Sequence, residues 1–104
     1  MNMVAALALL SALFYCIAMV AMKSWWTLPS LGVATIIAVA LLTAGAFEVA
    51  ALGHEKLGLI YVAVMGAEVI ILGVVSHFFF EEVYSVKEAA GMALVLVGTA
   101  VAWT

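Results

Sequence analysis

The chain has 104 residues, of which 70% are hydrophobic and 9% are charged. A soluble domain of this size cannot bury that much apolar surface, because typical domains are only about half apolar and small ones leave much of their surface in water. A net charge of -3 with only three basic residues excludes nucleic-acid binding, which needs clustered Lys and Arg. We therefore predict an integral membrane protein in contact with lipid.

Four apolar runs follow one another along the chain, separated by short polar breaks. Each run can cross a bilayer as a helix, because about 30 Å of hydrocarbon requires roughly 20 helical residues. None alternates apolar and polar residues, which excludes barrel strands. We predict an all-α membrane protein whose residues 1–104 form a single four-helix transmembrane domain, with spans at about 3–22, 31–52, 58–80 and 86–103.

The first span lacks the basic start of a signal peptide and is longer than its usual apolar core, so we expect it to be retained. Cys16 lies inside this apolar run and is interpreted as a small core residue. Trp25 and Trp26 follow the span, and paired tryptophans are typical of the aromatic belt at the lipid headgroups. We expect both to be interfacial anchors, with Pro29 suited to the start of the second helix.

Glu48 stands near the end of the second span, about one turn before the loop that contains His54. A carboxylate so close to a helix end can extend to the membrane surface. We therefore expect Glu48 to have a solvated, interfacial role.

The third span contains one carboxylate, Glu68, near its centre, where an unpaired charge costs about 3 kcal/mol or more. Tyr61 and Ser76 each lie about two turns away on the same face of the predicted helix. Glu68 is therefore either a proton- or cation-binding group, or a protonated structural group that hydrogen-bonds a neighbouring helix for about 1 kcal/mol.

Tyr15 lies at the middle of the first span, in a stripe with Ser11, Met19 and Met22 at helical spacing. Its hydroxyl either reaches a substrate or partner, or the side chain is an ordinary core aromatic. The candidate proton- or substrate-binding residues are therefore Glu68, Tyr61, Tyr15 and Ser76.

The fourth span begins with Ser85, a plausible N-cap, and Glu88 three residues later completes a capping box. Gly91, Gly98 and Ala102 follow at spacings that place small residues in one column. Such columns let two helix backbones approach closely in lipid. We predict a helix-packing or dimerisation seam here, within the subunit or between subunits.

Orientation in the membrane follows from the lysines in the loops. Lys23 and Lys87 fall on one predicted side and Lys56 on the other, which is almost no bias. The chain can therefore insert both ways and form an antiparallel dimer, or be held in one orientation by the weak lysine bias or by a partner. No nucleophile–base pair, nucleotide loop or metal-ligand spacing is visible, so we expect no enzyme, no cofactor and no metal.

Four motifs in order resemble the small multidrug resistance family, the four-helix branch of the drug/metabolite transporter superfamily. They are Met-Lys at 22–23 followed by Pro-Ser-Leu-Gly at 29–32, Gly-Leu-Ile-Tyr at 58–61 with Gly66, the Ser-His-Phe-Phe-Phe-Glu-Glu exit at 76–82, and the spaced glycines at 91 and 98. The similarity covers nearly the whole chain. It implies a four-helix bundle in the bacterial cytoplasmic (inner) membrane that dimerises through its fourth helix.

The chain departs from the family at three functional positions. Aligning the Met-Lys pair places Tyr15 where family exporters have their essential helix-one glutamate. Val64 occupies a tryptophan position, and Glu68 occupies a glycine position. Family members without the helix-one carboxylate move lipid-linked sugars or act as one half of a heterodimer.

The resemblance therefore implies a small transporter, or half of one, that moves an amphipathic or cationic solute or a lipid-linked head group. The expected partners are membrane lipids, a second copy or another membrane subunit, and a small-molecule substrate. A different class stays open, namely a non-transporting accessory or assembly subunit of a larger membrane complex.

Overall fold

The computed structural model describes residues 3–103. It contains four helices, α1 (Met3–Ser24), α2 (Leu31–Leu52), α3 (Leu57–Phe79) and α4 (Val86–Trp103), and no strand within that range. All four are long and apolar enough to cross a membrane. The predicted all-α, four-helix membrane fold is confirmed, and the helix ends lie within two residues of the predicted spans.

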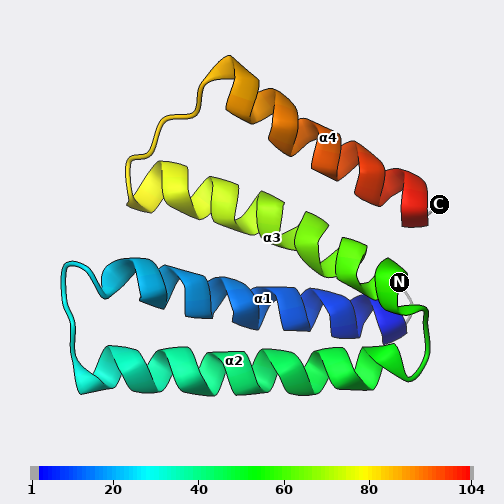
Figure 1. Ribbon diagram of the computed structural model, residues 1–104, viewed down its shortest axis with the longest axis horizontal. Helices are drawn as coiled ribbons and strands as arrows, with labels where there is room; N and C mark the ends of the chain where they lie inside the picture. The colour runs from blue at the N-terminus through cyan, green and yellow to red at the C-terminus, as the bar shows by residue number, and fades with distance from the viewer. Residues whose placement is uncertain (1–2, 104) are drawn as a thin grey trace.

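The four helices lie side by side in the order α2, α1, α3, α4 (Figure 1). The molecule measures 40 × 35 × 19 Å along its principal axes, so it is a flattened layer. α1 packs along both α2 and α3, whereas α4 packs against α3. The α1–α2 and α3–α4 connections lie at one end of the layer and the α2–α3 connection at the other, as the alternation of spans predicted.

Small side chains bring α1 close to its neighbours. Helices gain no hydrophobic energy by leaving lipid for each other, so close backbone contact has to supply the attraction. Ser11 Oγ donates a hydrogen bond of 2.9 Å to the carbonyl of Ala44 across this contact. Cys16 is buried among these residues, as predicted. The buried residues of the two helices are Ala8, Ser11, Ala12, Cys16 and Ala18 on α1 and Ala40, Ala44 and Ala51 on α2.

The contact between α3 and α4 depends on Gly66. A Cβ atom at this position would lie 2.7 Å from Thr99 Cγ2 and 2.9 Å from Thr99 Cβ, which is closer than real Cβ contacts allow. Trp103 adds a second attachment, because its Nε1 donates to the carbonyl of Leu59 at 3.0 Å. These contacts hold α4 near the end where α3 begins, and the two helices diverge toward the other end (Figure 1).

The predicted glycine column of α4 faces away from the rest of the subunit. Gly91, Gly98 and Ala102 are all exposed, and a Cβ added at either glycine would meet no atom within 4 Å. The column therefore takes no part in packing inside the subunit, where Gly66 of α3 is the close-contact glycine. Its role between subunits stays a prediction.

The start of α4 has the predicted capping box. The Glu88 N–H donates to Ser85 Oγ at 3.1 Å, and the Ser85 N–H donates to Glu88 Oε1 at 2.8 Å. Ser30, directly after Pro29, caps α2 by accepting from the Val33 N–H at 3.2 Å. These bonds satisfy backbone donors that a helix start leaves without partners.

We predict that Gly66→Ala weakens the α3–α4 contact, because the new methyl group collides with Thr99. Overpacking of this kind typically costs about 1–3 kcal/mol. The measurement is the free energy of unfolding in bicelles. Gly45→Ala is the matched control, because a Cβ at Gly45 meets no atom within 4 Å. If Gly66→Ala is as stable as Gly45→Ala, the helices do not approach at this position.

Candidate functional site

Tyr15 and Glu48 form a hydrogen bond between α1 and α2. The Tyr15 hydroxyl donates to Glu48 Oε1 at 3.0 Å, and the bond is partly buried. Side chains on a helix lean toward its N-terminus, and α1 and α2 run in opposite directions. The two side chains therefore lean toward each other along the membrane normal. Tyr15 lies one helical turn beyond Ser11 on α1 and Glu48 lies one turn beyond Ala44 in the opposite direction, so their bond spans the level of the Ser11–Ala44 contact.

The position of Glu48 corrects the expectation of an interfacial role. Its carboxylate turns back to Tyr15 instead of extending to the membrane surface. The reason is the face of α2 on which it lies, because Ala40, Ala44 and Ala51 are buried toward α1 and Glu48 shares their spacing of three and four residues. This spacing was the sequence signal that could have identified Glu48 as a site residue.

Glu68 supplies a second carboxylate to the same region. It is the twelfth of the 23 residues of α3 and is partly buried. It lies near Tyr15 and close enough to Glu48 for the two carboxylates to interact electrostatically. Within residues 3–103, its side chain has no hydrogen-bonding or ion-pair partner. Tyr15, Glu48 and Glu68 therefore converge from three helices, and we refer to these three residues as the interior site.

The interior site brings two carboxylates into one region of the helix layer. Two neighbouring carboxylates in a medium of low polarity repel each other when both are ionised. A single positive charge placed near both carboxylates would offset this repulsion. Tyr15 holds the Glu48 carboxylate in place through its hydrogen bond. Among the described residues there is no group of three or more His, Cys, Asp or Glu side chains that could hold a metal ion.

The other two predicted candidates lie outside this site. Tyr61 is 58% exposed. Ser76 lies at the far end of α3, where its Oγ bonds the Tyr84 hydroxyl and donates to the carbonyl of Gly73 at 3.2 Å. The structure thus brings Tyr15 and Glu68 together with Glu48 and separates Tyr61 and Ser76 from them.

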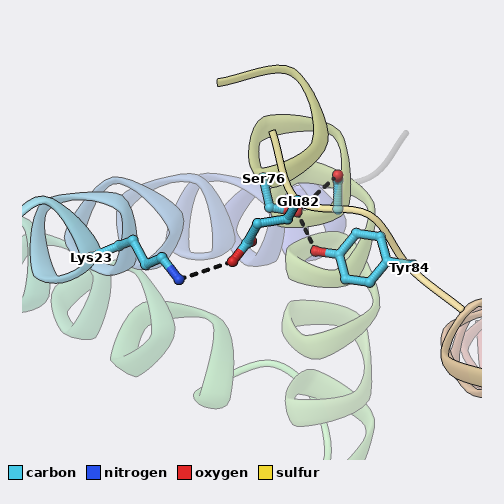
Figure 2. A network of polar contacts seen from close by, with 5 residues as sticks. Lys23, Ser76, Glu82 and Tyr84 are labelled. Carbon is cyan, nitrogen blue, oxygen red and sulfur yellow. Dashed lines mark hydrogen bonds and ion pairs between the residues drawn. The ribbon is translucent and has the colours of Figure 1, made fainter. Parts of the chain in front are cut away.

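A second group of polar residues lies at the end of the layer that holds the α1–α2 and α3–α4 connections. The Lys23 amine forms an ion pair of 2.9 Å with Glu82 Oε2 (Figure 2). The Glu82 N–H donates to the Ser76 carbonyl at 3.1 Å. Glu81 has a φ of 55°, the left-handed conformation that turns the chain just before Glu82. We refer to Lys23, Ser76, Glu82 and Tyr84 as the loop cluster.

The paired tryptophans lie in the turn after α1, at this same end of the layer. Trp25 is 38% exposed and Trp26 is 85% exposed. Both are thus available to lipid headgroups, and their role as interfacial anchors stays a prediction.

Comparison with known proteins finds no matching family model, no matching curated protein and no matching solved structure. The resemblance to the small multidrug resistance family therefore stays a prediction from the sequence motifs. The fold defines the chain as a small integral membrane protein of four helices.

We predict an energetic coupling between Tyr15 and Glu48, because each is the hydrogen-bonding partner of the other. In a double-mutant cycle of Tyr15→Phe and Glu48→Leu, the coupling measured by unfolding in bicelles should be about 0.5–2 kcal/mol. The control cycle pairs Tyr61→Phe with Glu48→Leu and should show no coupling, because Tyr61 is exposed. Equal coupling in the two cycles would contradict the observed bond.

Proposed function

We propose that the protein is a small transporter, or one half of a dimeric one, that moves a small cationic or amphipathic solute or a lipid-linked head group. The observation that supports this proposal best is the interior site. Ionisable groups inside transmembrane helices are costly, and they are typical of proton and substrate pathways. Two such carboxylates lie near each other in this chain, on α2 and α3, and Tyr15 of α1 hydrogen-bonds one of them.

The interior site explains how the chain could act without the family's helix-one glutamate. Tyr15 occupies the position that the resemblance assigns to that residue. The carboxylates of Glu48 and Glu68 lie beside it, so the negative charge comes from α2 and α3 instead of α1. Exchange of a proton for a cationic solute at this pair would couple the two movements.

The shape of the subunit favours a pathway between two subunits. Four helices side by side in a layer enclose little space for a solute. The exposed column of Gly91, Gly98 and Ala102 is of the kind that lets helices of two subunits approach closely. The even distribution of lysines suits a partner in either orientation. We therefore propose a homo- or heterodimer with α4 at the contact.

One observation favours a second function, that of an accessory or assembly subunit in a larger membrane complex. The Glu68 side chain has no hydrogen-bonding partner among the described residues of its own subunit. A polar side chain on a neighbouring protein would satisfy it, and a bond of this kind is worth about 1 kcal/mol in a bilayer. Gentle detergent extraction separates the two functions, because a self-dimer supports transport and a stoichiometric complex with a larger protein supports the accessory role.

We predict that Glu68→Gln folds and assembles normally but loses pH-dependent transport, because Gln keeps the shape of Glu and cannot bind or release a proton. Proton-driven uptake of an aromatic quaternary ammonium probe into proteoliposomes should fall at least about tenfold. A carboxyl band that titrates in the infrared spectrum of the wild type should disappear in the variant.

Glu55→Gln is the matched control, because Glu55 lies in the α2–α3 connection, where its carboxylate accepts the N–H of Lys56. It should leave uptake and the titrating band unchanged. A fully active Glu68→Gln variant, together with no titrating band in the wild type, would remove the coupling role and place the accessory function first.

A further inference from the structure

A cavity of about 190 Å³ lies between α1 and α3 and extends to the loop cluster. Its outer part is polar, with the Lys23 amine, the Glu82 carboxylate and the hydroxyls of Ser76 and Tyr84. Its inner part is apolar. Met19, Leu72 and Val75 line this inner part.

The inner end of this cavity lies next to the interior site. α1 and α3 run in the same direction, so equal steps along the two helices correspond to equal depths (Figure 1). Met19 is four residues from Tyr15, and Leu72 is four residues from Glu68. Four residues correspond to about 6 Å along a helix. The cavity therefore extends from the loop cluster to within one turn of Tyr15 and Glu68.

The cavity is large enough for water. A volume of about 190 Å³ corresponds to about six water molecules at about 30 Å³ each. The polar groups at the outer end supply hydrogen-bonding partners for them. A proton or a small hydrated cation entering here would have only one helical turn of apolar side chains left to cross.

Contacts between the α3–α4 connection and the ends of α1 and α3 cover the outer end. The ion pair between Lys23 and Glu82 joins the end of α1 to this connection (Figure 2). The bond between Tyr84 and Ser76 joins the connection to α3. The Lys23 and Glu82 side chains are 55% and 38% exposed. Ion pairs this exposed to water are weak and break readily.

We propose that this cavity is the access path to the interior site from the membrane side that holds the α1–α2 and α3–α4 connections, and that the Lys23–Glu82 ion pair is its latch. Breaking the pair frees the α3–α4 connection from α1 and opens the outer end. The destination of the path rests on the proposed transport function. The path and its latch do not depend on transport and are tested separately.

The test measures how fast single cysteines react with a membrane-impermeant, positively charged thiosulfonate in lipid nanodiscs. The background is Cys16→Ala, which removes the native thiol. Leu72→Cys probes the inner end of the cavity, and Val75→Cys repeats the test one turn nearer its mouth. Ile36→Cys is the control, because Ile36 lies at a similar depth on α2, five residues from the helix start, and is 50% exposed away from this cavity.

We expect both cavity cysteines to react at least about tenfold faster than the cysteine at position 36. Glu82→Gln should raise the rate at position 72 several-fold further. The charge exchange Lys23→Glu with Glu82→Lys should return that rate to the original value, because it restores the ion pair.

Two results would overturn the proposal. If both cavity cysteines react as slowly as the control, the cavity is not a water path. If Glu82→Gln leaves the rate at position 72 unchanged, the ion pair is not the latch. Rapid labelling together with unaltered transport in Glu68→Gln would support the path and reject the proposed coupling, so the two failures are distinguishable.

Discussion

Close contact between small residues holds this layer of helices together. In a bilayer, helices do not gain hydrophobic energy by packing, because lipid is as apolar as a leucine side chain. The buried faces of α1 consist of alanines, a serine and a cysteine, which let neighbouring backbones approach closely. The buried residues of α2 are alanines at 40, 44 and 51. The same principle acts between α3 and α4 through Gly66. Larger residues at these positions would separate the backbones and remove the attraction.

This close contact also determines which polar groups meet. The Ser11–Ala44 bond shows how α1 is aligned along α2. In this alignment the Tyr15 and Glu48 side chains reach each other. α3 packs on the other side of α1 and brings Glu68 to the same region. Two carboxylates therefore lie near each other in the membrane interior, where a single unpaired carboxylate is already costly, and Tyr15 hydrogen-bonds one of them. The free-energy cost of placing carboxylates inside the bilayer is the main physical reason to connect this site with the movement of charge.

The sequence correctly predicted the features that depend on the thickness of the bilayer or on hydrogen bonds between residues close in the chain. The helix ends agree within two residues, because hydrocarbon thickness sets the length of an apolar run. The capping box at Ser85 and Glu88 is also present, since it needs only residues three apart. Partners between helices were harder to predict. The interfacial role expected for Glu48 was inferred from its short distance to the end of the helix. Its actual partner, Tyr15, follows from the helix face that Glu48 shares with the buried alanines.

The other differences between the predicted and the observed structure also arise from contacts between helices. Gly66, Gly91 and Gly98 are chemically identical, but Gly66 packs against Thr99 while the other two have open space beside them. Which glycine forms the close contact between α3 and α4 depends on the face that α4 turns toward α3. Helical spacing alone does not specify that face. Tyr61 shares a helical face with Glu68 by spacing, yet it is exposed. Spacing along one helix predicts which residues share a face, but it does not predict which parts of that face a neighbouring helix covers.

The convergence of Tyr15 and Glu48 is the central claim, and solid-state NMR of the protein in lipid tests it most directly. With ¹³C in the tyrosine ζ carbons and the glutamate δ carbons, the hydrogen bond predicts a cross-peak between Tyr15 and Glu48 at short mixing times. That cross-peak should vanish in Glu48→Ala and remain in Glu55→Ala. A wild-type spectrum without a tyrosine–glutamate contact that depends on Glu48 would contradict the account.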